Sequence, residues 1–276
     1  MTMTTRVLGN GSGWSVEDIL CSAGPKDPPF EEQHGWARIA FVIHGTFRYE
    51  TVDGAADLVP GSVLLGTPRH CFQCGHEHGW GDRCIAFGFA PETLESVAAQ
   101  LPGVRSAAFG RAALPPLEAL MPLAARAAAL DGDKAECEAL AFEAAETVVS
   151  TLGEIVPSEA TPRASDRRRV ADALKRIEKD FESPLSLSEL AAGAGLSEFH
   201  FLRVFRALVG MTPHQFLLRT RLHQAALRLR KTADSISAIA FDCGFGDLST
   251  FNHRFRRVMG VNPSRWRDRN GRSAST

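Results

Sequence analysis

The sequence lacks the features that mark several specialised classes of protein. No apolar run approaches the roughly 20 residues that a bilayer-spanning helix needs, and the N-terminal stretch MTMTTRVLGNGSG lacks the apolar centre of a signal peptide. Six cysteines in 276 residues do not amount to a disulfide framework. There is no Ser/His/Asp array and no phosphate-binding loop that would indicate an enzyme. We therefore expect a cytoplasmic protein with reduced thiols and no membrane-spanning segment.

The chain has almost no net charge, but the two signs are unevenly distributed. The formal net charge is −1. Residues 163–276 hold 21 Lys and Arg against 11 Asp and Glu, a local balance of +10, whereas the first 162 residues hold 10 basic and 21 acidic side chains, a balance of −11. Such asymmetry is typical of a nucleic-acid module joined to a part that does not touch nucleic acid. The alternative, two solvated domains that happen to differ in charge, stays open.

The first half of the chain is predicted to form short strands followed by helices. The apolar runs RIAFVIH and TFRYETV flank Gly45 as in a hairpin, and Pro60-Gly61 marks another turn before the strand-like run RCIAFGF. Short strands at this spacing favour a small sandwich or barrel. After Pro91 the pattern becomes helical, with a short helix and then a helical hairpin at about residues 117–130 and 133–152.

A segment near the C-terminus is written twice. SLSELAAGAGLSEFHFLRVFRALVGMTP begins at Ser186, and SISAIAFDCGFGDLSTFNHRFRRVMGVNP begins at Ser235. The offset is 49 between Gly195 and Gly244 but 50 between the prolines that end the two copies, so the second copy has one extra residue after its glycine turn. Each copy has the pattern of a helix, a turn, a second helix and a terminal Gly-x-x-Pro. Two helix-turn-helix units in tandem are suited to binding a nucleic-acid duplex twice.

Residues 167–268 resemble the AraC/XylS family of bacterial transcription regulators. The matching positions lie in both copies and in the long helix predicted between them, about residues 214–231. They are Ala191, Gly195, Leu196, Ser197, Phe201, Arg203, Phe205, Gly210, Pro213, Arg221, Ala225, Ile239, Ala240, Gly244, Phe245, Phe251, Phe255 and Pro263.

The resemblance implies an α+β protein of two domains. Residues 1–154 are expected to form a cupin-like β-barrel with a helical hairpin that senses an effector, 155–166 a Pro/Ser/Thr-rich linker, and 167–270 an all-α domain with two helix-turn-helix units. The implied partners are promoter DNA, as a double helix, and a small-molecule effector. Contact with RNA polymerase and a homodimer are left open. The implied function is transcription regulation, not catalysis.

Candidate DNA contacts are the residues expected on the outer faces of the second helix of each copy. Arg203 is the candidate for a bidentate contact to guanine, and Asn252 for a contact to adenine. The phenylalanines Phe201, Phe205, Phe251 and Phe255 are assigned to the core. Arginines such as Arg206, Arg254, Arg256 and Arg257, with Arg219 and Arg221 nearby, are expected to contact phosphates or in part to brace the fold. The remaining candidates are Glu198, Phe199, Leu202, Asp247, Leu248, Ser249 and His253.

The segment HCFQCGHEHGWGDRC concentrates metal-ligating side chains in the N-terminal half. The alternation of Cys74, His76 and His78 would place three donors on one side of an extended segment, as a tetrahedral zinc site requires, with His34 or Cys71 as the fourth ligand. Two alternatives stay open. One is a thiol sensor that joins Cys71 and Cys74 in a reversible disulfide, and the other is a polar loop at the mouth of the pocket.

The competing function is a metal-dependent cupin enzyme, or a metal or thiol sensor, that carries a DNA-binding tail. An enzyme of this kind needs three or four ligands converging inside the barrel with one coordination position open. The metal-binding His-x-His motif of cupins is not found at the first strand, where His34 stands alone. The doubled segment therefore favours a regulator over an enzyme.

Overall fold

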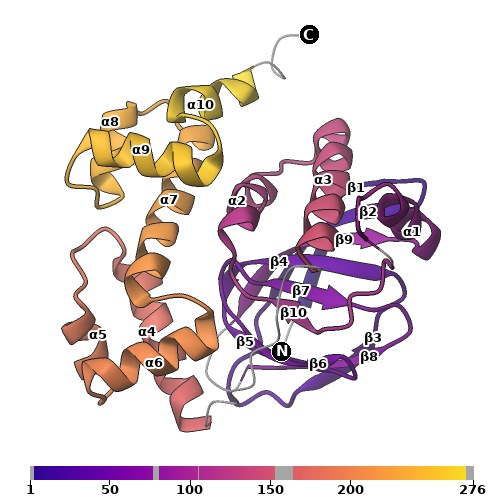
Figure 1. Ribbon diagram of the computed structural model, residues 1–276, viewed down its shortest axis with the longest axis horizontal. Helices are drawn as coiled ribbons and strands as arrows, with labels where there is room; N and C mark the ends of the chain where they lie inside the picture. The colour runs from indigo at the N-terminus through magenta and orange to yellow at the C-terminus, as the bar shows by residue number, and fades with distance from the viewer. Residues whose placement is uncertain (1–2, 77–80, 105, 153–163, 272–276) are drawn as a thin grey trace. The chain divides into compact units, whose positions relative to one another are not determined.

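The computed structural model describes residues 3–76, 81–104, 106–152 and 164–271 (Figure 1). The chain divides into two compact units, Met1–Ala171 and Asp172–Thr276. The predicted linker lies outside the described residues up to position 163, and its last three residues begin helix α4 (Ala164–Asp180). None of the helices among the described residues combines the length and the hydropathy that a bilayer-spanning segment requires.

The strands of the N-terminal unit form two antiparallel sheets rather than the single closed barrel expected. The larger sheet has the order β1 (Met3–Gly11), β2 (Trp14–Cys21), β9 (Asp82–Phe89), β4 (Ala37–Gly45), β7 (Val63–Gly66) and β10 (Ala113–Leu114). The smaller sheet has the order β3 (Phe30–Gln33), β8 (Cys71–Gly75), β5 (Phe47–Thr51) and β6 (Gly54–Leu58).

The larger sheet is the middle layer of this unit, because both of its faces are buried. On β9, Ile85 and Phe87 face a cluster shared with the helices, whereas Cys84 and Ala86 face the smaller sheet. This follows from the twofold alternation of side chains along a strand. The helices on the first face are α1 (Pro91–Ala99), the 3-10 turn η1 (Glu118–Leu120), α2 (Met121–Ala128) and α3 (Lys134–Leu152), and Figure 1 shows α3 beside β1 and β2. The predicted helical hairpin corresponds to α2 and α3.

The hairpin predicted around Gly45 is wrong. Strand β4 pairs with β7 and β9, and β5 pairs with β6 and β8, so the chain passes from one sheet to the other at this glycine. Gly45 has a φ of +83°, and a Cβ there would lie 2.2 Å from the carbonyl oxygen of Gly81. A glycine between two strand patterns indicates a turn in either case, and only the pairing partners distinguish a hairpin from a crossover.

The C-terminal unit is helical, and its two copies have helix caps at equivalent positions. Together with α4 it contains α5 (Leu187–Gly193), α6 (Glu198–Val209), α7 (Pro213–Lys231), α8 (Ile236–Asp242), α9 (Leu248–Met259) and α10 (Pro263–Gly271). Helices α6 and α9 each end at a left-handed glycine, Gly210 and Gly260, both with φ of +76°. Thr212 and Asn262 then accept a hydrogen bond from the third residue of the next helix, which begins at a proline. The Gly-x-x-Pro pattern is therefore a helix stop followed by a helix start.

The predicted aromatic core of this unit is confirmed. Phe201, Phe205, Phe251 and Phe255 are fully buried. The rings of Phe201 and Phe205 are tilted against each other at 5.6 Å, and those of Phe251 and Phe255 at 5.4 Å, so each copy has the same aromatic pair at the same place. In the second copy, Trp266 of α10 packs edge-on to Phe255 and donates its Nε1–H to the Ala226 carbonyl of α7.

Candidate nucleic-acid interface and ligand pocket

Each copy of the doubled segment folds as a helix-turn-helix unit. In the first, Ser186 caps α5 with a capping box to Glu189, and Ser197 caps α6. In the second, Ser235 caps α8, and Asp247 caps α9 by accepting from the Thr250 amide at 2.7 Å. The two helices of each unit are separated by four residues in the first copy, 194–197, and by five in the second, 243–247, so the extra residue lies in the second turn.

The second helices of the two units, α6 and α9, expose equivalent positions. An offset of 50 relates Leu202 to Asn252 and Arg203 to His253, and the same offset relates the buried phenylalanines on the opposite face. Positions 199, 202, 203 and 206 are three or four residues apart, so their side chains form one stripe along the helix. In α6 this stripe holds Phe199, Leu202, Arg203 and Arg206, and in α9 it holds Ser249, Asn252, His253 and Arg256.

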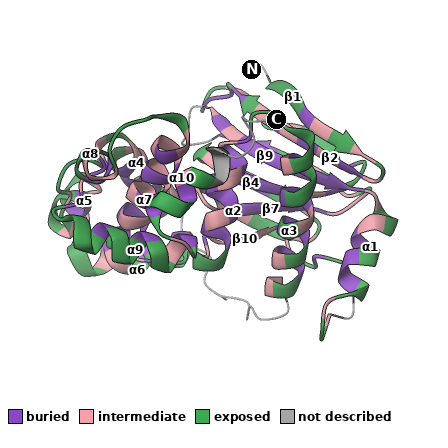
Figure 2. Ribbon diagram, turned by 90° about the horizontal axis from the view of Figure 1, so that it is seen from above, coloured by how far each residue is buried: buried purple, intermediate pink, exposed green. Residues whose placement is uncertain are grey.

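Helices α6 and α9 lie along one side of the C-terminal unit (Figure 2). Figure 1 shows α9 and α6 towards the two ends of α7, and Figure 2 shows both helices along the same exposed edge. Helix α7 has 19 residues, so it is about 28 Å long. This length is comparable to the 34–36 Å that separates successive major-groove segments on one face of a duplex.

The structure exposes almost all the predicted DNA contacts. Phe199 is 78% exposed and Leu248 37%. Leu202 is intermediate, and the other predicted contacts on α6 and α9 are exposed. One of these residues has a structural role as well. Asp247 is the cap of α9, and this hydrogen bond from the Thr250 amide lowers the pKa of its carboxyl group.

Arg221, which was expected to contact phosphate or brace the fold, braces the fold. Its Nε–H donates to the Phe181 carbonyl at 2.7 Å and its Nη2 to the Ser183 carbonyl at 2.9 Å. These bonds hold the segment between α4 and α5 against α7. Gly244 of the second turn packs against the same arginine. A Cβ at this position would lie 2.9 Å from the guanidinium.

The N-terminal unit contains a pocket between its two sheets, with a cavity volume of about 200 Å³. Its lining is mixed, with aromatic rings from the smaller sheet beside ionisable groups. The ion pair of Arg38 with Glu17, at 2.9 Å, is one such group. The other lining residues that carry aromatic rings, charges or thiols are Cys21, Phe30, Glu32, His34, Phe47, Phe72, Cys74, His76, Asp82 and Cys84.

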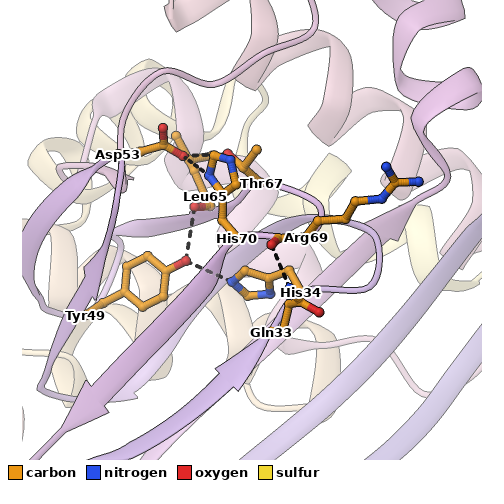
Figure 3. A network of polar contacts seen from close by, with 8 residues as sticks. All are labelled: Gln33, His34, Tyr49, Asp53, Leu65, Thr67, Arg69 and His70. Atoms are coloured by element: carbon orange, nitrogen blue, oxygen red, sulfur yellow. Dashed lines mark hydrogen bonds and ion pairs between the residues drawn. The ribbon is translucent and has the colours of Figure 1, made fainter.

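His34 lies in the wall of this pocket and is held by hydrogen bonds rather than by a neighbouring cysteine (Figure 3). Its Nε2 lies 2.8 Å from the hydroxyl oxygen of Tyr49, which donates to the Leu65 carbonyl at 3.3 Å. Because that hydroxyl proton is used, His34 is the donor and Nε2 carries the proton. Burial lowers the pKa of His34 to about 4, so the ring is neutral at pH 7. Its face stacks on Phe72 at 4.1 Å.

The loop before β8 is fixed to the same wall of the pocket. Asp53 accepts from the hydroxyl of Thr67 at 2.7 Å and pairs with Nδ1 of His70 at 3.0 Å, as the dashed lines of Figure 3 show. The Arg69 amide donates to the His34 carbonyl at 2.7 Å. The polar network therefore positions both His34 and the start of β8, from which the Cys/His segment continues.

Among the described residues, no three of the predicted metal ligands bring their donor atoms within 4.8 Å of one another. Cys71 is exposed, whereas Cys74 is buried between the sheets, and His34 takes part in the network with Tyr49. His78 lies outside the described residues. His76 is buried, and its Nε2 lies 2.6 Å from Oδ2 of Asp82.

His76 meets two side chains that sequence reasoning missed, Cys21 and Asp82. The donor atoms of these three residues lie within 4.8 Å of one another. Burial by itself lowers the pKa of His76, but the hydrogen bond with Asp82 and the neighbouring sulfur of Cys21 raise it to about 9. Cys21 ends a strand in the N-terminal region that we had not assigned, and Asp82 begins the strand recognised as RCIAFGF. A strand assignment for residues 14–21 would have placed Cys21 at the end of a strand, but it would not have identified Asp82 as its partner.

Two equivalent units joined by one helix define the C-terminal half as a tandem helix-turn-helix domain. A family model described as "Helix-turn-helix domain" matches residues 190–269. The HTH-type transcriptional activator AarP of Providencia stuartii is 33% identical over 98 residues, which are 36% of this chain and 73% of AarP. The chain belongs to the AraC/XylS family of helix-turn-helix transcription regulators.

Other relatives match the same third of the chain. The probable transcriptional regulator LumQ of Photobacterium leiognathi is 36% identical over 90 residues, 33% of this chain and 36% of LumQ. A crystal structure of the DNA-binding domain of AdpA in complex with a target DNA is 28% identical, covers 39% of this chain and 98% of that domain, and has a TM-score of 0.37. The match spans about a third of the length of LumQ. AarP and LumQ are named as transcription regulators, not as enzymes.

Proposed function

We propose that this protein is a sequence-specific transcription regulator that inserts α6 and α9 into successive major-groove segments of a promoter. The observation that carries the proposal is the pair of helices α6 and α9, which lie along one side of the C-terminal unit, have exposed side chains at equivalent positions and are joined by a helix of about 28 Å. The basic charge of residues 163–276 favours a polyanionic partner. The curated relatives AarP and LumQ carry the same function in their names.

The two stripes would contact different bases. Arg203 of α6 suits a bidentate contact to guanine, with Phe199 and Leu202 against thymine methyl groups. Asn252 of α9 suits adenine, with His253 beside it. Phosphates would be contacted by the arginines at the ends of the stripes, Arg206 and Arg256, and by Arg254 and Arg257. Because the halves differ, one chain would recognise an asymmetric site.

The N-terminal unit would sense an effector in the pocket between its sheets. The two facing sheets are consistent with a cupin-like domain, and a cavity of about 200 Å³ with both aromatic and ionisable walls suits a small polar molecule or ion. The effector would alter the affinity of the protein for its promoter through its differential binding to two states. Promoter binding would place the protein in the cytoplasm.

The proposal is tested by selecting binding sites from a random duplex library with the full-length protein. The selected site should be asymmetric, and its affinity should fall steeply with salt concentration because phosphate contacts release counterions. Arg203→Ala should relax the preference at one base pair, at a cost of about 1–3 kcal/mol for that base. Lys26→Ala, which removes an exposed positive charge from the N-terminal unit, is the matched control and should leave the site and its affinity unchanged.

Two results would contradict this assignment. If the library yields no preferred sequence, the exposed stripes do not read bases. If Arg203→Ala weakens binding equally for every sequence and lowers the salt dependence, then this arginine contacts a phosphate, and the specificity of the first unit lies elsewhere.

A further inference from the structure

One end of the pocket in the N-terminal unit brings a thiol, an imidazole and a carboxylate together from three segments of the chain. Cys21 is the last residue of β2, Asp82 is the first residue of β9, and His76 directly follows β8. Cys21 and Asp82 are paired across their strands, so their side chains lie on the same face of the larger sheet. His76 reaches them from the end of the smaller sheet. Within the part of the chain that the structure describes, no other group of three such donors converges.

The backbone around these residues permits the close approach. Gly81 has a φ of +68°, and a Cβ at this position would lie 2.8 Å from the Cys21 carbonyl oxygen. Its amide donates to the Ala23 carbonyl at 2.8 Å. The Ala23 amide in turn donates to Sγ of Cys21 at 3.5 Å. The glycine therefore allows β2 and β9 to place Cys21 directly beside Asp82.

The three side chains are buried, and one of their donor atoms has no hydrogen-bond partner within the described part of the chain. Relative exposure is 8% for Cys21, 4% for His76 and 8% for Asp82. His76 uses Nε2 towards Asp82, but its Nδ1 is buried without a hydrogen-bond partner among the described residues. An orphaned buried nitrogen carries a desolvation penalty unless a ligand satisfies it. The ring is also held in place by the face of Phe47, whose centroid lies 5.7 Å away.

We propose that Cys21, His76 and Asp82 bind a single thiophilic divalent cation of the zinc class. A thiolate and an imidazole select zinc over the hard ions calcium and magnesium, and the thiolate and carboxylate together balance two positive charges. Donors in a tetrahedral zinc site with bonds of 2.0–2.3 Å lie about 3.5 Å apart. The observed separations, all within 4.8 Å, therefore close around an ion with shifts of about 1 Å. Binding releases two protons to water, the thiol proton of Cys21 and one ring proton of His76, whose pKa of about 9 keeps the imidazole protonated at pH 7 before the ion binds.

The remaining coordination position would face the pocket, because all three ligands line it. A site with three protein ligands and one open position exchanges its ion or accepts a further ligand more readily than a closed four-ligand site. Resting on the function proposed above, we assign this ion as the effector, or as part of the effector, of the N-terminal unit. The metal site itself does not depend on that function.

The test uses the full-length protein, stripped with a chelator and titrated with Co²⁺ as a spectroscopic probe. The site predicts a thiolate-to-cobalt charge-transfer band that saturates at a single ion per chain and is abolished by Zn²⁺. Cys21→Ser should remove the band. His76→Gln and Asp82→Asn, which nearly preserve side-chain shape, should each weaken Co²⁺ binding by more than about tenfold. Cys71→Ser, at an exposed cysteine on β8, is the control and should leave the band unchanged.

Several outcomes would overturn the proposal. These are the absence of a charge-transfer band in the wild type, a band that survives in folded Cys21→Ser, and a band that disappears in Cys71→Ser. Circular dichroism of each variant shows whether it is folded. The regulatory role is measured separately, as the affinity for the selected duplex with and without Zn²⁺. An unchanged affinity overturns the effector assignment, whereas a metal-binding protein that never binds DNA overturns the proposed function and leaves the metal site intact.

Discussion

The two helix-turn-helix turns predict unequal responses to the same substitution. Gly195 and Gly244 occupy equivalent places, and both have a positive φ, +64° and +82°. A Cβ at Gly195 would have no heavy atom within 4 Å, so Gly195→Ala adds only the cost of a left-handed alanine. That cost is about 1–2 kcal/mol. At Gly244, a Cβ would lie 2.6 Å from the Glu182 carbonyl oxygen and 2.9 Å from the guanidinium of Arg221.

The clash at Gly244 cannot be relieved cheaply, because both neighbours are fixed. The backbone at Glu182 lies between two carbonyls that accept from Arg221 at 2.7 and 2.9 Å, and moving either partner breaks those bonds. Each hydrogen bond to a charged group contributes about 1.5–3 kcal/mol. Gly244→Ala should therefore cost about 3–5 kcal/mol in all, roughly 2–3 kcal/mol more than Gly195→Ala.

Hydrogen exchange followed by mass spectrometry reports each helix-turn-helix unit separately. In the native state, Gly244→Ala should speed the exchange of amides in α8 and α9 by roughly two orders of magnitude or more, since 1.4 kcal/mol corresponds to a factor of ten. Gly195→Ala should change exchange in α5 and α6 by about tenfold. Equal effects in the two units, or a larger effect in the first, would refute the role that we assign to Arg221.

Three further predictions concern single side chains. Phe199→Ala should leave the free energy of unfolding within about 0.5 kcal/mol, because the side chain is 78% exposed, yet weaken binding to the selected duplex by roughly fivefold in a fluorescence titration; unchanged DNA affinity would contradict it. Trp266→Phe should cost about 1–2 kcal/mol in urea unfolding, because the Ala226 carbonyl loses its buried donor, and an unchanged midpoint would argue against that bond. Burial raises the pKa of Asp18, but hydrogen bonds from Arg83 and Arg6 outweigh it and lower the pKa below its ordinary value. The stability from these bonds is therefore present above about pH 4 and lost as the pH falls through the folded-state pKa. Asp18→Asn should cost about 1–3 kcal/mol in urea unfolding at pH 7 and much less at pH 3, whereas Glu95→Gln, at an exposed site, should cost little at either pH. An equal cost of Asp18→Asn at both pH values would sink this account.

The C-terminal half was predictable because its signals are local and occur twice. Caps such as Ser186 and Ser235, and glycines such as Gly210 and Gly260, act within one helix turn of their positions, so the sequence alone defines where each helix begins and ends. The spacing of the phenylalanines defines the buried face in the same way.

The N-terminal half was less predictable because sheet pairing is not local. Strand β2 pairs with β9 more than 60 residues later, and nothing near Cys21 indicates that Asp82 lies opposite it. The alternation of Cys74 and His76 did predict a shared inward side, and both are buried. The partners of His76 come from the larger sheet. Cys21 lies far outside the Cys/His segment, so counting donors within that segment could not find it, and Asp82 lies inside the segment but pairs with Cys21 only through the sheet.

The central claim is that α6 and α9 enter two major-groove segments of one duplex. Methylation interference at guanine N7, with adenine N7 probed in parallel, tests it on the selected site with the full-length protein. We predict two clusters of interference about 10 base pairs apart on one face of the duplex. Arg203→Ala should weaken only one cluster, and Asn252→Ala only the other. A single cluster, or two clusters that weaken together in both variants, would contradict the account.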